Sequence, residues 1–118
     1  MMHAGEGAVR ARQREGAAAD RPTIAAAVRY TLGLLTTQAP GRTVEVRVPP
    51  YAAVQCVAGP RHTRGTPPNT VETDPQTWLG LATGAQTWSE AMRAGTVRVS
   101  GERAQLSALL PLIGQPTW

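Results

Sequence analysis

The residue types that most often carry metal binding or nucleophilic catalysis are scarce in this chain of 118 residues. It has one cysteine, Cys56, and two histidines, His3 and His62. A zinc site needs three or four ligands at recognisable spacing, and one cysteine with one histidine does not provide them. The serines have no nearby base, and no paired carboxylates or glycine-rich phosphate loop are present. The sequence therefore predicts no catalytic residue, no metal site and no cofactor, and a protein that is not an enzyme.

Cys56 is a candidate reactive thiol only where a neighbouring group lowers its pKa. No histidine or lysine stands next to it in the sequence. Val54 and Cys56 instead share one face of an alternating segment, and a buried structural cysteine is the commoner role for such a residue.

The segment from Gly59 to Asn69 is the loop richest in chemistry. Two guanidinium groups within four residues can hold a carboxylate or a phosphate through paired hydrogen bonds. The alternative, which such loops adopt more often, is a stiff surface loop with solvated arginines or with ion pairs to Glu72 and Asp74. The candidate residues for an anion or headgroup contact are Arg61, His62 and Arg64.

Composition narrows the class of protein. The net charge of +4 is carried by arginine alone, since the chain has no lysine, and this modest surplus without clustering does not predict nucleic-acid binding. A single cysteine allows no internal disulfide. No apolar run approaches the length of about 18 residues that spans a membrane, and the first twenty residues contain no secretory apolar block. We expect a cytoplasmic protein without stable membrane insertion.

The chain length predicts one domain. Residues 1–20 show no period and no turn chemistry, so we expect a disordered or frayed tail there. Residues 21–118 are expected to form the domain. Its first element is a helix from Thr23 to Gln38, because apolar residues recur there at spacings of four, four and three. These residues are Ile24, Val28, Leu32 and Leu35.

Alternating valines predict a β-hairpin after this helix. The first strand runs from Thr43 to Val48, Pro49-Pro50 forms the turn, and the second strand runs from Ala52 to Val57. A short third strand is expected over residues 70–73.

The stretch from Asp74 to Ile113 contains two short helices, a strand and a third helix. Asp74-Pro75 begins the first helix and Gly84 ends it. Thr87 and Glu90 fit a capping box for the second, which ends at Gly95. Val97 and Val99 alternate as in a strand. Leucines at helical spacing predict a third helix, which ends at Pro111; they are Leu106, Leu109 and Leu110.

This order of elements resembles the sterol carrier protein family. The turn Ala82-Thr83-Gly84, the pair Ala94-Gly95 and the loop up to Asn69 carry the resemblance, which covers Arg21 to Ile113 and points to a small bacterial branch found mostly in actinobacteria. It implies a sheet of about five strands and helices that enclose an apolar tunnel. Four strands are recognisable here. We therefore predict an α+β fold with a mostly antiparallel sheet of about four to five strands covered by helices.

The apolar faces of the expected covering helices supply the candidate ligand-binding residues. Each of them taken singly is more often part of a core, and ligand contact is most plausible for Trp88, Met92 and the C-terminal leucines. An empty cavity of about 300 Å³ would cost about 7 kcal/mol, a large part of the stability of a small domain. We thus expect a small pocket, a collapsed one, or one that its ligand stabilises. The candidates are Trp78, Leu81, Trp88, Met92, Leu106, Leu109 and Leu110.

Three functions are compatible with the sequence. The first is an intracellular binding or carrier domain for a lipid-like molecule of fatty acyl, isoprenoid or sterol-like type. The second is a non-catalytic accessory domain that acts with a partner enzyme, as similar domains do in mycothiol-dependent maleylpyruvate isomerase-like proteins. The third is a structural homodimer module with the end of the chain, from Leu112 to Trp118, as its contact surface. We expect the first.

Overall fold

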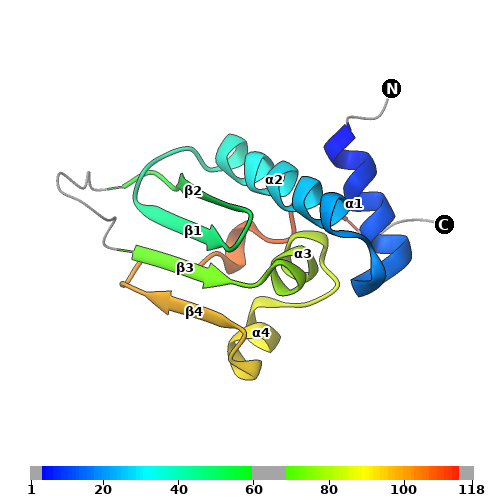
Figure 1. Cartoon of the computed structure of the whole chain (residues 1–118). Coiled ribbons are helices and arrows are strands. Elements are labelled where there is room, and N and C mark those ends of the chain that lie inside the picture. Colours follow the sequence, from blue (N-terminus) through cyan, green and yellow to red (C-terminus); the bar gives the residue numbers. More distant parts are fainter. Residues whose placement is uncertain (1–3, 60–68, 115–118) are drawn as a thin grey trace.

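A four-stranded sheet is the framework of the protein (Figure 1). The computed structural model describes residues 4–59 and 69–114. The strands are β1 (Val44–Val48), β2 (Ala52–Cys56), β3 (Asn69–Thr73) and β4 (Val97–Ser100), in the order β2-β1-β3-β4. β1 is antiparallel to β2, β3 is antiparallel to β4, and the central pair β1–β3 is parallel. The predicted α+β fold with four strands is confirmed, and the sheet is mixed.

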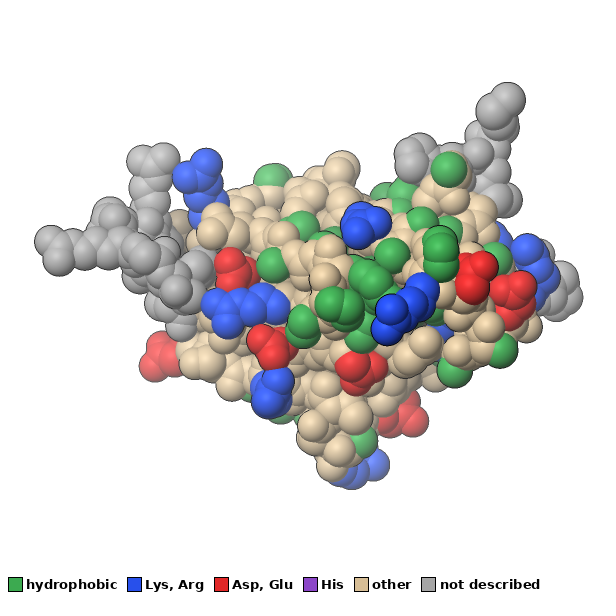
Figure 2. All heavy atoms as spheres, viewed as in Figure 1, with side chains coloured by type: hydrophobic (Ala, Val, Ile, Leu, Met, Phe, Trp, Pro, Cys, Tyr) green, Lys and Arg blue, Asp and Glu red, His purple; other side chains and the backbone are tan. Residues whose placement is uncertain are grey.

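The two faces of the sheet differ in polarity because strand side chains alternate. On one face the register aligns Val46 with Val54 and Val71, and Val71 with Val99. On the other face Arg47 pairs with Glu45, and Arg98 pairs with Glu72 at 2.5 Å. Both pairs lie at the surface in partial contact with solvent, so each contributes little to stability. In Figure 2, acidic and basic side chains lie interspersed over the part of the molecule where Figure 1 draws the sheet.

The long helix α2 (Arg21–Gln38) provides much of the core. The side chain of Asp20 caps its first turn by accepting a hydrogen bond from the backbone N–H of Thr23 at 2.9 Å, and Pro22 fits a position where no N–H is needed. A hydrogen bond from the Thr23 side chain and this backbone bond lower the pKa of the Asp20 carboxyl. The predicted apolar stripe is confirmed, since all four of its members are buried; they are Ile24, Val28, Leu32 and Leu35.

A buried hydrogen bond joins α2 to α3 (Pro75–Thr83). Trp78 is fully buried, and its indole N–H donates to the hydroxyl of Thr31 at 2.8 Å. That hydroxyl in turn donates to the carbonyl of Ala27 at 2.7 Å. Every buried side-chain polar atom among the described residues has a partner. The indole ring therefore fills the space between the two helices without leaving its polar group unsatisfied.

The expectation of a disordered tail is wrong for residues 4–18. The N-terminal residues form α1 (Ala4–Glu15) and the short 3₁₀ helix η1 (Gly16–Ala18). Val9 is fully buried, and Gly5 lies so close to Tyr30 of α2 that a Cβ on it would stand 2.5 Å from the Tyr30 Cβ. Arg12 also donates to the side chain of Gln76 at 2.9 Å. Docking onto α2 and α3 stabilises a helix that its own sequence scarcely signals.

The predicted third helix of the C-terminal stretch is also wrong. The segment forms only the single 3₁₀ turn η2 (Ser107–Leu109). This helix could form only between the turn that begins at Gly101 and Pro111, which cannot sit inside a helix. That stretch is too short for a stable helix, because helix nucleation is costly. The backbone N–H groups of Leu112 and Ile113 both donate to the carbonyl of Ala82, at 2.8 and 2.9 Å. The segment is thus tied to the end of α3.

The Trp78–Thr31 bond leads to a stability prediction. Thr31→Val leaves the indole N–H buried without an acceptor, and we expect it to lower the free energy of unfolding by about 1–3 kcal/mol. Thr37→Val is the matched control, because Thr37 is exposed on the same helix and its hydroxyl donates only to the Gly33 carbonyl. Urea titration compares the two variants. Equal losses would show that the buried bond does not hold α3.

The docking of α1 can be tested with two glycine substitutions of opposite expected sign. Gly33→Ala places its Cβ in open space on α2 and should raise the free energy of unfolding by up to about 1 kcal/mol. Gly5→Ala gains the same helix propensity but forces α1 away from Tyr30, so it should destabilise the protein. Thermal unfolding measures both. A stabilising Gly5→Ala would mean that α1 is not packed on α2.

Candidate functional site

The turn between α3 and α4 (Trp88–Ala94) builds one side of a pocket. Gly84 ends α3 with a φ of 80°, a left-handed conformation that glycine adopts at little cost. The predicted capping box of α4 is confirmed: Glu90 accepts from the backbone N–H of Thr87 at 2.7 Å, and Thr87 accepts from that of Glu90 at 3.1 Å. The bond from the backbone N–H of Thr87, followed by one from its side chain, lowers the pKa of the Glu90 carboxyl. The direction in which α4 leaves the turn is thereby fixed.

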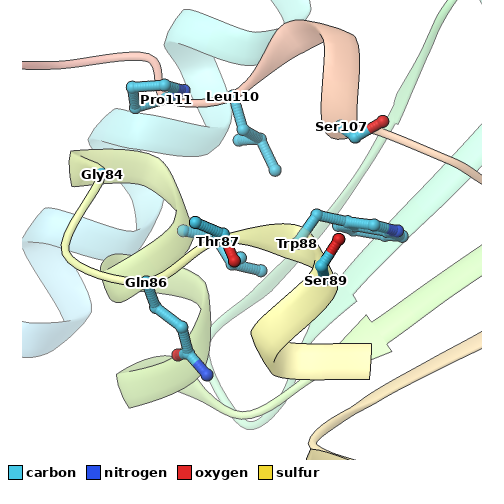
Figure 3. A pocket seen from close by; sticks show the side chains of 9 residues that line it. Gly84, Gln86, Thr87, Trp88, Ser89, Ser107, Leu110 and Pro111 are labelled. Atoms are coloured by element: carbon cyan, nitrogen blue, oxygen red, sulfur yellow. The ribbon is translucent and has the colours of Figure 1, made fainter. Parts of the chain in front are cut away.

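The C-terminal segment forms the opposite side of the pocket. It includes the turn η2, and its next residues are held by the two hydrogen bonds to Ala82. Figure 3 shows Leu110 and Pro111 on this segment facing Thr87 and Trp88 across the space between them. The two sides come from parts of the chain that are joined only through β4 and the turn after it.

The pocket has a volume of about 370 Å³, at the small end of the range for small-molecule sites. Leu81 is 1% exposed and is the most deeply buried of its lining residues. Trp88 and Leu110 are half-buried, whereas the hydroxyl residues around them lie exposed. The site thus has apolar depth and a polar rim. Its described lining consists of Leu81, Gly84, Gln86, Thr87, Trp88, Ser89, Ser107, Leu110 and Pro111.

The structure brings together three of the seven residues predicted for an apolar pocket, namely Leu81, Trp88 and Leu110. Trp78 and Leu106 are fully buried in the core instead. Leu109 packs half-buried against the core, and Met92 is 40% exposed on the outer side of α4. Helical spacing identifies an apolar face, but it does not say whether a core, a pocket or solvent meets that face.

The sequence prediction missed the polar rim of the pocket. Hydroxyl and amide residues gave no signal because they stand in turns and at helix starts, where they are common for local reasons. The capping box at Thr87 was the one available indication of where the turn lies. The missed residues are Gly84, Gln86, Thr87, Ser89, Ser107 and Pro111.

The predicted anion contact at Arg61, His62 and Arg64 lies outside the described residues. The two acidic residues expected as alternative partners of these arginines, Glu72 and Asp74, have other contacts. Glu72 pairs with Arg98, and both carboxylate oxygens of Asp74 accept from Thr77, at 2.8 and 2.7 Å. Asp74 therefore serves as the cap of α3.

A second hollow of about 410 Å³ lies where β3 ends and β4 begins. Its charged and hydroxyl groups are engaged within the protein. Glu72 pairs with Arg98, Asp74 caps α3, and the Thr73 hydroxyl donates to the carbonyl of Thr96 at 2.7 Å. This hollow offers less apolar surface and fewer available polar groups than the first, so the first is the better candidate site.

Cys56 is fully buried, and this burial raises the pKa of its thiol to about 11. The structure therefore agrees with a structural role for this residue. Among residues 4–59 and 69–114, no three metal-ligating side chains lie close enough to hold a metal ion. In the same part of the chain, no helix has the length and apolar character needed to cross a bilayer.

The raised pKa leads to a reactivity prediction. In the folded protein almost no Cys56 thiolate exists at mildly alkaline pH, so alkylation by iodoacetamide should be slow and limited by unfolding. An exposed cysteine introduced by Ser100→Cys should react rapidly in the same sample. Because the unfolded thiol ionises at a lower pH, stability should fall as the pH rises from about 9 toward 11. Rapid alkylation of Cys56 in the native protein would contradict its burial.

A known protein family matches most of this chain. Residues 20–112 match the model of a family described as bacterial SCP ortholog, where SCP denotes sterol carrier protein. The match covers most of the chain and includes all nine described residues that line the pocket. Helix α1 precedes the matched residues. No curated protein matches the chain.

Proposed function

Since the chain belongs to the family of bacterial sterol carrier protein orthologues, we propose that it binds a lipid-like molecule in the pocket between the α3–α4 turn and the C-terminal segment. The observation that carries the proposal is the apolar depth of this pocket. Leu81 lies at its most buried point, and Trp88 and Leu110 flank it. A ligand that covers these side chains removes apolar surface from water, which favours binding by about 25 cal/mol per Å².

The form of the pocket suggests a carrier that exchanges its ligand. The family resemblance implies an enclosed tunnel, but Trp78 and Leu106, two of its expected lining residues, are buried in the core and do not line this pocket. The pocket instead has an exposed rim. Water can fill it in the absence of ligand, so the cost of an empty cavity does not arise and no tightly held ligand is needed for folding.

We propose binding and transfer without catalysis. The described lining residues include no histidine, cysteine, lysine or carboxylate, so they contain no strong general base or activated nucleophile. The roles of accessory domain and homodimer module stay as alternatives. A cytoplasmic location and membership of an actinobacterial branch stay predictions.

The binding proposal predicts opposite results for two sets of variants. We expect Leu110→Gln and Trp88→Ala each to weaken binding of the apolar dye Nile red by about tenfold, because each removes apolar contact area from the pocket. Met92→Gln is the control, since Met92 is exposed on the same helix as Trp88 but does not line the pocket. Fluorescence titration measures the dissociation constants, and circular dichroism checks that each variant is folded.

Two outcomes would count against the proposal. Equal weakening by Met92→Gln would place the dye outside the pocket. An absence of binding by the wild-type protein, both to Nile red and to a panel of fatty acids, alcohols and sterol-like lipids, would remove the carrier function. Sedimentation and a search for a stable protein complex would then decide between the dimer and accessory roles.

A further inference from the structure

The described lining of the pocket contains no charged side chain. Its polar members are one amide and three hydroxyls, which belong to Gln86, Thr87, Ser89 and Ser107. Such groups donate and accept hydrogen bonds but supply no counter-ion. A charged headgroup that moved from water to this rim would lose part of its hydration shell, and no opposite charge of the described lining would replace it.

A fixed charge beside the pocket is the carboxylate of Glu90. It accepts a hydrogen bond from the backbone N–H of Thr87 at 2.7 Å, and Thr87 itself lines the pocket. The carboxylate is thus held beside the rim by the capping box, and its negative charge repels an anion placed there. It does not attract a cation strongly either, because Glu90 is fully exposed and Arg93 lies one turn later on the same helix.

The hydrogen-bonding groups of the rim are available to a ligand. Within the described part of the chain, the hydroxyls of Ser89 and Ser107 and the side-chain amide of Gln86 have no hydrogen bond to another protein group. The Thr87 hydroxyl, in contrast, is engaged with Glu90 in the capping box, so the available groups are those of Gln86, Ser89 and Ser107. In Figure 3, Ser89 and Ser107 lie near the Trp88 indole, at the opposite end of the pocket from Gly84 and Pro111. Two free hydroxyls therefore lie at the indole end of the pocket.

We propose that the pocket selects lipids with a neutral, hydrogen-bonding headgroup, such as an alcohol, an amide or an ester, over lipids with a carboxylate, phosphate or ammonium group. The proposal rests on the proposed function, since it assigns the ligand class of the same site. The apolar part of the ligand covers Leu81, Trp88 and Leu110, and its headgroup lies among the rim hydroxyls.

Three probes of equal chain length test this selectivity at neutral pH: 1-dodecanol, dodecanoate and dodecylammonium, each below its micelle concentration. Displacement of Nile red from the wild-type protein measures their affinities. We expect 1-dodecanol to bind at least about tenfold more tightly than either ion. The affinity of dodecanoate should rise as the pH falls through the pKa of its carboxylic acid, because the protonated form is neutral.

A charge-insertion variant provides a second test. Ser107→Arg places a guanidinium at the rim and should raise the affinity for dodecanoate by about tenfold, whereas the affinity for 1-dodecanol should not rise, because an alcohol offers the guanidinium no charge to pair with. Ser100→Arg is the matched control, because Ser100 is equally exposed at the end of β4 and does not line the pocket. It should leave both affinities unchanged.

The outcomes separate the inference from the proposed function. Tighter binding of dodecanoate or dodecylammonium than of 1-dodecanol, or equal binding of all three, overturns the neutral selectivity and leaves the lipid-binding function standing. Binding of none of the three, together with no binding of Nile red, overturns both. The inference is also overturned if Ser100→Arg raises the affinity for dodecanoate as much as Ser107→Arg does. An added charge would then strengthen binding from outside the pocket as well.

Discussion

The indole N–H of Trp78 is the constraint on which much of the structure depends. A buried donor without an acceptor is costly, so the ring can occupy the core only where Thr31 meets it. This requirement fixes the position of α3 along α2. The end of α3 then carries the Ala82 carbonyl and the Gly84 turn to the places from which both sides of the pocket are built.

The elements that could be predicted from the sequence are those with a local cause. Asp74 before Pro75, and Thr87 three residues before Glu90, satisfy unpaired N–H groups within a single turn, and both helix starts are found as expected. The valines of β1 show their alternation within five residues. Helix α1 could not be predicted in this way, because its stability comes from packing on α2, where Val9 is buried and Gly5 fits against Tyr30.

The pocket shows the same division between local and long-range causes. Helical spacing selected Leu81 and Trp88, but it selected Trp78 and Leu106 for the same reason, and only the arrangement of the sheet and helices separates the core pair from the pocket pair. The parallel pairing of β1 with β3 belongs to this class as well. Register across two distant strands depends on the path of the chain between them, which no short sequence pattern describes.

The attachment of the end of the C-terminal segment to the Ala82 carbonyl has a consequence for the timescale of motion. Leu112 and Ile113 both bond to Ala82, and η2 adds one turn of its own. These bonds and the packing of Leu110, Leu112 and Ile113 against the core hold this side of the pocket. None of them belongs to the sheet or to the Trp78–Thr31 bond, so this end of the segment can open while the sheet and the α2–α3 pair stay intact. Its opening is therefore a local event of lower free energy than global unfolding. A ligand bound as proposed would exchange on the timescale of this segment, and the amide hydrogens of Leu112 and Ile113 are expected to exchange with solvent faster than those of the central strands.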